Sequence, residues 1–379
     1  MRYRLAIVQH GDYADALRII QSGEPEPYTG MSYSVETLER LCAGIEHLIV
    51  SLDASRYHIR RDMGELVGFS APLWKKGRKL PWSWMAYRAV RAFRPTHVLV
   101  RTGGILALPI LEDSTRRGLD TLVLMAGMMM PTGRWHRLIN PPLVRRLNHP
   151  SVSLVGNHRR PAADSLIAAG VHREKVVAYD WPGQPHPSEH PPKSGPPPGP
   201  CHVVFAGTMV VGKGIGDLLE AIGQLSRDGL PVRLTACGEG PELPALRRRA
   251  EALPPGTAEF PGRIPNSRVR DLMREATFVC VASRRDQSEG LPFAVTEALA
   301  ARTPLMASDH PCLTPLLHDG EGLRFFQGGD LADLTRVIRE VIEDPESYAR
   351  LSESTAAAFA RIECPTLFHE LLEHWRASW

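Results

Sequence analysis

Residues 283–300 read SRRDQSEGLPFAVTEALA and directly follow a short apolar run, Phe278–Val281. A run of this length and character is typical of a buried strand in a parallel sheet. Pro292 suits the first position of a helix, because the proline ring fixes φ and its missing N–H costs nothing there. The sequence therefore predicts a strand, a loop and then a helix from about Phe293 to Ala301, which is a unit of parallel α/β structure.

Two carboxylates bracket the predicted helix start. Glu289 lies just before it, and Glu297 lies between one and two turns inside it. The N–H groups and the dipole at a helix start favour an anion such as phosphate. Carboxylates would repel a phosphate, so they must serve another part of the ligand, and hydroxyl groups donate charge-assisted hydrogen bonds to carboxylates. A ligand with both a diphosphate and many hydroxyls is a nucleotide sugar.

The spacing of Glu289 and Glu297, with seven residues between them, resembles the E-x7-E signature of retaining GT-B glycosyltransferases. The words EGLP and EALA around them are similar to those of the large family 4 of these enzymes. The resemblance implies an α/β protein with two Rossmann-like, doubly wound domains, whose parallel sheets face a central cleft. It also implies that Glu297 binds the ribose and that Glu289 holds hydroxyls of the donor sugar. The turn would complete the donor site through Gly290, Leu291, Pro292 and Phe293.

A glycine-rich loop, 207–214, reads GTMVVGKG and follows the strand-like run 201–206. A loop of this kind that carries a lysine is suited to a diphosphate, although it has neither the P-loop spacing nor the dinucleotide fingerprint. It resembles the G-R…K-G element of the same family, whose arginine and lysine hold the donor phosphates. Gly207 and Lys213 match that element, so both are predicted to bind the donor.

Two positions depart from the family pattern. Thr208, which we keep in the predicted donor site, stands where the arginine is expected, so one cation is lost, and Arg284 or Arg285 is a candidate to replace it. Gly127 stands where family 4 enzymes often place a histidine that touches the transferred sugar. His136 lies nearby in the sequence, but its charged neighbours favour a surface position.

Three further residues enter the predicted donor site through the resemblance. In relatives the backbone that corresponds to Arg263 and Ile264 meets the nucleotide base. Gly30 precedes a predicted helix from about Ser34 to Ala43, where the family has a glycine pair beside the donor phosphates. A plain turn glycine is an equally good interpretation of Gly30.

The clearest boundary in the chain is the proline-rich stretch 184–200, which predicts an extended linker. Before it, in residues 1–183, strand-like runs alternate with helix-length segments, which predicts a Rossmann-like domain, and the resemblance assigns it to the acceptor. After it, residues 201–364 are predicted to form the nucleotide-sugar-binding domain. The resemblance implies that a final helix, 365–379, crosses back onto the first domain.

The 379 residues suffice for two domains, and 43% hydrophobic with 23% charged residues is typical of a globular protein. No apolar run approaches the roughly 20 residues of a membrane helix, and the first residues, Met1–Arg4, show no signal-peptide region. The six cysteines are scattered among mostly apolar neighbours, which favours reduced thiols and a cytoplasmic protein. The 15 histidines show no metal-binding spacing, so no metal site is predicted.

A net charge of +3 does not by itself indicate nucleic acid binding. Basic residues nevertheless crowd the first half of the chain in short runs, at 60–61, 75–79, 116–117, 145–146 and 159–160. A solvated surface is one interpretation of these runs. Attraction to an anionic acceptor or to an anionic membrane surface is the other, which would add peripheral contact with the inner face of the membrane.

Together these features predict a retaining, metal-independent hexosyltransferase. It would move a sugar from a nucleoside diphosphate sugar, with UDP favoured, to a hydroxyl of a glycan, lipid-linked or small-molecule acceptor. Lys213 and the helix dipole would stabilise the leaving diphosphate, and no cofactor is expected beyond the donor. Two alternatives stay open: a GT-B sugar-nucleotide epimerase, and a catalytically silent nucleotide-sugar-binding protein, which the departures at Thr208 and Gly127 favour.

Overall fold

The computed structural model describes residues 3–24, 30–52, 54–70, 80–129, 134–182, 185–287 and 289–379, without the side chains of residues 80–83, 105 and 134–137. The basic run 75–79, the side chain of His136, the first residue of the predicted linker, Gln184, and Ser288 therefore lie outside the described residues. Among the described residues, none of the helices combines the length and the apolar character that crossing a bilayer requires.

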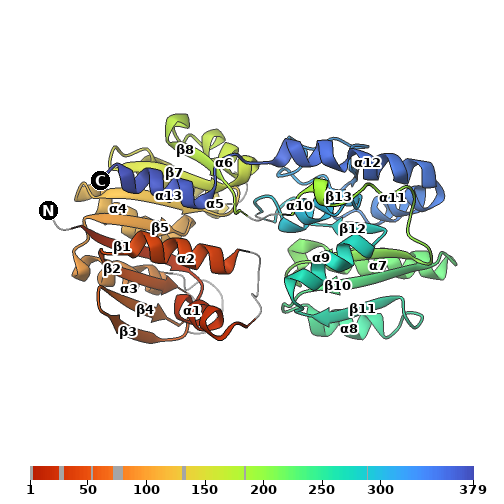
Figure 1. The fold of residues 1–379 in the computed structure, drawn as a ribbon, viewed down its shortest axis with the longest axis horizontal. Helices are drawn as coiled ribbons and strands as arrows, with labels where there is room; N and C mark the ends of the chain where they lie inside the picture. Colours follow the sequence, from red (N-terminus) through yellow and green to blue (C-terminus); the bar gives the residue numbers. More distant parts are fainter. Residues whose placement is uncertain are drawn as a thin grey trace. The chain divides into compact units, whose positions relative to one another are not determined.

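The chain forms two compact units, one of Met1–Pro182 with Cys364–Trp379 and one of Gly183–Glu363. The C-terminal segment thus returns to the first unit, where α13 (Phe368–Ala377) lies against α2 (Met31–Cys42), as the blue and red helices of Figure 1 show.

The proline-rich stretch belongs to the second unit and does not separate the two units as a free spacer. Two groups of Lys193 anchor it there. Its backbone N–H donates to Ser352 Oγ, and its Nζ donates to the carbonyl oxygen of Ala276, both over 2.7 Å. Prolines cannot join a ladder of hydrogen bonds, so a few such anchors hold the segment on the surface.

The first unit is built on an eight-stranded sheet in the order β3-β4-β2-β1-β5-β6-β7-β8. Its strands are β1 (Arg4–His10), β2 (Glu46–Leu52), β3 (Tyr57–Arg61), β4 (Gly64–Phe69), β5 (His97–Arg101), β6 (Asp120–Met125), β7 (Val152–His158) and β8 (Val176–Tyr179). All neighbours pair in parallel except β3 and β4, an antiparallel edge that the sequence did not predict. The exposed, polar run of β3 lacks the apolar signal of the other strands.

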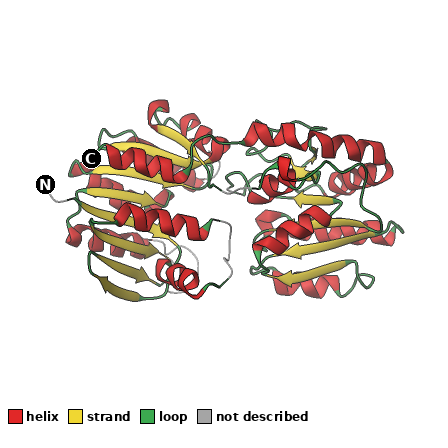
Figure 2. Ribbon diagram, viewed as in Figure 1, coloured by secondary structure: helices red, strands yellow, loops and turns green. Residues whose placement is uncertain are grey.

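Helices cover both faces of this sheet, as Figure 2 shows in red and yellow. They are α1 (Tyr13–Ser22), α2, α3 (Leu80–Phe93), α4 (Leu108–Arg116), α5 (Arg134–Leu147), α6 (Arg159–Ala168) and α13. Alternate residues of β1 serve the two faces, because successive side chains of a strand point in opposite directions. Leu5 and Ile7 pack with α2 and α13, whereas Ala6 and Val8 pack with α3, α4 and α5.

The second unit has a fully parallel six-stranded sheet in the order β11-β10-β9-β12-β13-β14. Its strands are β9 (Cys201–Ala206), β10 (Val232–Cys237), β11 (Ala258–Gly262), β12 (Phe278–Val281), β13 (Leu305–Ser308) and β14 (Leu323–Phe326). Its helices are α7 (Ile215–Arg227), α8 (Leu243–Ala250), α9 (Asn266–Glu275), α10 (Phe293–Ala300), α11 (Leu331–Glu343) and α12 (Pro345–Ile362). The strand order reverses between β9 and β12, and ligands of doubly wound sheets bind at such a switch point.

Candidate functional site

Two loops follow the strands at this switch point and lie against each other. We call residues 207–214, after β9, the glycine loop, and residues 282–291, after β12, the glutamate loop. The backbone N–H of Arg284 donates to the carbonyl oxygen of Gly212 over 2.8 Å. A Cβ added at Gly212 would lie 1.9 Å from Gln287 Oε1, so a larger residue there would require the Gln287 side chain to move. The two loops therefore form one packed surface at the ligand edge of the sheet.

The structure brings the two predicted catalytic residues into direct contact. Lys213 Nζ lies 2.6 Å from Glu289 Oε1, and Ser283 Oγ donates to the same carboxylate oxygen over 3.1 Å. The side chains of Lys213 and Glu289 are only 21% and 9% exposed. Burial of a charge is costly unless the charge is paired and hydrogen-bonded. Here Lys213 and Glu289 neutralise each other, and Ser283 adds a hydrogen bond to the carboxylate. The pair thus places one cation and one carboxylate side by side at the switch point.

Glycines that the sequence did not single out make the close approach of the loops possible. Gly214 has φ +69°, and a Cβ there would lie 2.0 Å from the carbonyl oxygen of Ala282. Gly238, after β10, has φ +138°, and its Cβ would lie 1.9 Å from the carbonyl oxygen of Gly207. Gly207 itself meets only ordinary contacts, so the steric need lies with its neighbours. The predicted donor residue Thr208 is exposed beside it.

The two arginines considered as replacements for the missing cation are both engaged by carboxylates. Arg284 holds Asp217, in the first turn of α7, through NH2 at 2.9 Å and Nε at 3.2 Å. Arg285 NH1 lies 3.1 Å from Asp309 Oδ2. Arg284 therefore ties the glutamate loop to α7 and is part of the framework, whereas Arg285, at 61% exposed, is held less tightly.

Helix α10 begins at Phe293, as the sequence predicted, but Pro292 does not occupy the first helical position. Pro292 is the residue before the helix, not its first residue, because its ψ of 136° is extended and helical geometry starts at Phe293. Gly290 and Leu291 lead into this turn, and Leu291 is buried. Residues 294–300 are buried, so the helix that follows the glutamate loop is packed into the core of the second unit.

Glu297 is 5% exposed and lies on the side of α10 that faces α9. Together with α9 and the proline-rich segment, Glu297 lines a pocket of about 560 Å³. Three arginines of α9 share the lining: Arg268, Arg270 and Arg274. The second predicted glutamate is therefore buried but still borders open space in the second unit.

The other predicted donor residues belong to other elements. Arg263 is 56% exposed and pairs with Glu239 over 3.3 Å, and Ile264 follows it after β11. Gly30 lies in the first unit, where it has φ +82° at the start of α2. A Cβ on Gly30 would meet the ring of Trp181 at 3.5 Å, an ordinary contact.

The ligand edge of the first unit carries a buried charge network that the sequence did not indicate. Asp180, after β8, accepts from Arg159 Nε over 2.8 Å and lies 3.2 Å from His158 Nε2. Arg159, which the sequence grouped with the basic surface, is 1% exposed, so that interpretation is wrong for this residue. Burial alone would raise the pKa of Asp180, but the His158 hydrogen bond and the Arg159 charge outweigh it and lower that pKa. The one sequence signal that could have pointed to Asp180 is its position directly after a strand.

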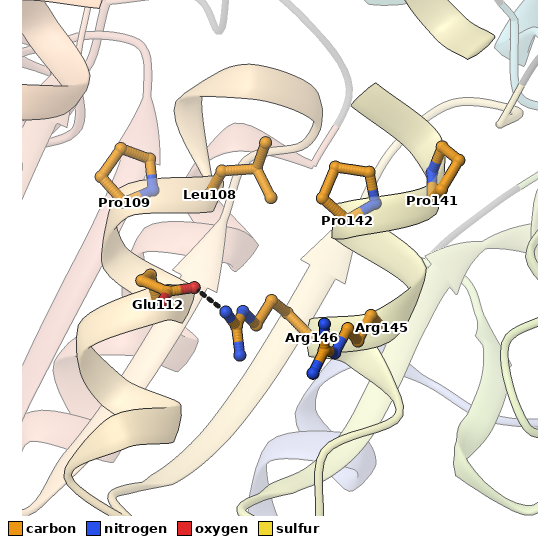
Figure 3. Close-up of a pocket in the computed structure, with 7 residues that line it drawn as sticks. All are labelled: Leu108, Pro109, Glu112, Pro141, Pro142, Arg145 and Arg146. Carbon is orange, nitrogen blue, oxygen red and sulfur yellow. Dashed lines mark ion pairs between the residues drawn. The ribbon is translucent and has the colours of Figure 1, made fainter. Parts of the chain in front are cut away.

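A separate pocket of about 600 Å³ lies between α4 and α5 of the first unit (Figure 3). Prolines line much of it, and Arg146 forms an ion pair with Glu112 across it. None of the predicted site residues borders this pocket.

Comparison with known proteins separates the two halves of the chain. The family described as glycosyl transferases group 1 matches residues 188–357, which lie in the second unit. The glycosyltransferase TuaC of Bacillus subtilis, named for teichuronic acid biosynthesis, is 31% identical over 159 residues, or 41% of this chain. The alpha-D-kanosaminyltransferase of Streptomyces kanamyceticus is 25% identical over 160 residues, also 41% of the chain. The matches span 38% and 39% of these relatives.

Solved structures match over both units. Anabaena HepE in complex with UDP aligns with a TM-score of 0.61 and 14% identity, over 99% of this chain and 98% of that one. Sucrose-phosphate synthase from Thermosynechococcus elongatus aligns with a TM-score of 0.66 and 14% identity, over 100% and 98% of the two chains. Identities this low show the fold alone. Over residues 188–357 the chain is thus similar to the glycosyl transferases group 1 family, and its fold is the predicted GT-B fold.

Proposed function

We propose that this chain is a retaining glycosyltransferase of the family 4 type, which moves a sugar from a nucleoside diphosphate sugar to an acceptor hydroxyl. The observation that carries the proposal is the ion pair of Lys213 and Glu289 at the switch point of the second sheet, 2.6 Å apart and largely buried. The family match over the same unit supports it. UDP is the favoured nucleotide, since the structural neighbour HepE binds it.

In this proposal the two members of the pair act on different parts of the donor. Lys213 meets the charge that develops on the leaving diphosphate, with the N-terminal end of α10 contributing its dipole. Glu289 accepts hydrogen bonds from hydroxyls of the donor sugar. Glu297 holds the ribose, and Arg263 and Ile264 approach the base. Fixed donors of this kind accelerate the reaction only if they bind the transition state better than the ground state.

The proposal includes an enzyme that needs no divalent ion, because Lys213 and the helix dipole take that role. Transfer would therefore continue in EDTA. We also propose a cytoplasmic protein with a glycan, lipid-linked or small-molecule acceptor. The exposed side chains of Trp84 (58%) and Leu138 (68%), with exposed arginines in the same unit, support peripheral contact with a membrane.

The test is transfer from UDP-sugars by Glu289→Gln and Glu289→Ala, with Glu343→Ala as a control on the exposed end of α11. We expect transfer to fall by about 100-fold or more in both Glu289 variants, while UDP binding stays near that of the control. The melting temperature of Glu289→Ala should fall, because Lys213 loses its buried partner, so transfer is measured well below that temperature. Turnover near that of the wild type in either variant would show that the role given to Glu289 is wrong.

A silent nucleotide-sugar-binding protein is the second candidate. Thr208 supplies no cation, and Arg284 is engaged by Asp217, which supports this alternative. A protein that binds UDP by calorimetry but neither transfers nor hydrolyses the sugar with any acceptor would favour it. Conversion of the donor to an isomer without an acceptor would instead indicate an epimerase.

A further inference from the structure

One buried histidine lies beneath the glutamate loop and has no role in the proposed reaction so far. His310 follows β13, is 0% exposed, and contacts the glutamate loop at Gln287. Its Nε2 lies 2.9 Å from the carbonyl oxygen of Gln287, two residues before Glu289. A fully buried imidazole needs partners for both ring nitrogens, so this contact is part of how the loop is held.

The hydrogen bonds of His310 define its tautomer. The backbone N–H of Cys312 donates to Nδ1 over 3.1 Å, so Nδ1 is an acceptor and carries no proton. A carbonyl oxygen only accepts, so Nε2 must donate to Gln287. The ring is therefore neutral with its proton on Nε2. Burial lowers the pKa of His310, which keeps this neutral form near neutral pH.

The carbonyl that His310 holds belongs to a residue that also fixes the glycine loop. The side chain of Gln287 fills the space beside Gly212, and Lys213 is the next residue along that loop. One donor, Nε2–H, thus holds the backbone carbonyl of Gln287. Two residues later, Glu289 places its carboxylate against Lys213 Nζ. Ser308 Oγ anchors the other end of the loop by donating to the carbonyl oxygen of Ser283 over 2.7 Å.

We propose that His310 is a positioning residue for Glu289: its Nε2–H fixes the carbonyl of Gln287 and thereby the place where the carboxylate meets the donor sugar. The inference rests on the proposed function, because it gives Glu289 a sugar to bind. It adds a residue outside the family signature and predicts that His310 affects binding of the sugar more than binding of the nucleotide.

Two substitutions separate the two hydrogen bonds of the ring. His310→Gln puts an amide N–H close to the position of Nε2 and can donate to Gln287. His310→Asn puts its polar group close to the position of Nδ1 and cannot reach that carbonyl. Cys312→Ala is the matched control: it removes the thiol whose Sγ lies 2.9 Å from Nδ1, but it keeps both the backbone N–H that donates to Nδ1 and the Nε2–H donor.

The first measurement is amide hydrogen exchange of the free proteins over residues 283–291. We expect faster exchange in His310→Asn, and rates near those of the wild type in His310→Gln and Cys312→Ala. Equal exchange in the Asn and Gln variants would overturn the inference, and this result does not depend on any ligand.

The second measurement compares the dissociation constants of UDP and of UDP-glucose, UDP-galactose or UDP-N-acetylglucosamine, whichever binds the wild type most tightly. The gain from the sugar should fall about fivefold to tenfold in His310→Asn, as for the loss of about one hydrogen bond, and should be retained in His310→Gln. A gain that falls equally in Cys312→Ala would mean a merely structural role and overturn the inference. Wild-type protein that binds none of these nucleotides would overturn the proposed function in its UDP form, whereas the exchange result still decides the role of His310.

Discussion

The two units stabilise their ligand edges in different ways. In the second unit, ion pairs join the glycine loop and α7 to the glutamate loop: Lys213 with Glu289, and Arg284 with Asp217. In the first unit, a buried charge network centres on Asp180, and the aromatic ring of Phe368 comes from the returning C-terminal segment. The ion pairs of the second unit lie within one contiguous stretch of the chain, which a family model matches. The network of the first unit lies where segments that are distant in sequence meet. In the proposed function, the second unit binds the nucleotide, which is shared within the family, and the first unit binds the individual acceptor.

The largest expected effect on stability tests the buried network of the first unit. Asp180→Ala should lower the free energy of unfolding by about 3–5 kcal/mol, because it leaves the buried Arg159 charge without its carboxylate. Asp217→Ala, in the more exposed pair of the second unit, should cost about 1 kcal/mol or less. Urea unfolding of both variants measures the difference. Equal losses would mean that the two units do not differ in this respect.

The next effect concerns chemistry in the second unit. Lys213→Met should lower transfer about 100-fold to 1,000-fold, because the cation that meets the leaving diphosphate is lost. Steady-state rates with a UDP-sugar measure this, and Lys213→Arg, which keeps the charge, should recover part of the rate. If Lys213→Met left turnover intact, the role given to Lys213 in the reaction would be wrong.

Acid should destabilise the second unit through His202, which is 3% exposed. Burial and then the nearby Arg233 charge lower its pKa from 6.5 to about 4. Between these values the unfolded chain binds a proton that the folded unit does not, so stability falls as pH falls from 6.5 toward 4. The loss approaches about 3 kcal/mol. Unfolding free energies of the wild type and of His202→Gln across this range should diverge, and parallel curves would contradict the assignment.

The smallest effect separates the two interpretations of Gly30. Gly30→Ala should cost about 1 kcal/mol, because an L-residue is strained at a positive φ. The added methyl would contact Trp181 inside the first unit, so donor KM should change less than twofold. A tenfold or larger rise in donor KM would instead place Gly30 beside the donor phosphates and weaken the contrast between the units.

How well the sequence predicted each unit depends on whether its elements have a local signal in the sequence. The strand Phe278–Val281 is confirmed to the residue, and α10 begins at Phe293 as expected, because apolar runs and turn residues are local signals. The exposed strand β3 was missed, since it has no apolar run.

Long-range contacts account for most of what could not be predicted at the sites. His158 and Asp180 meet only because β7 and β8 are neighbours in the sheet. His310 reaches Gln287 only through the pairing of β12 with β13. The tight glycines, such as Gly238, depend on backbone atoms of a neighbouring loop, which spacing in the sequence does not indicate.

The return of residues 364–379 has a consequence for biosynthesis. Phe368 and Trp375, both almost fully buried, complete the core on one face of the first sheet. Domains generally fold as units while the chain emerges from the ribosome. The second unit is continuous in sequence and can fold as soon as it is made, but the first must wait, with that face of its sheet only partly covered, until residues 364–379 have been translated.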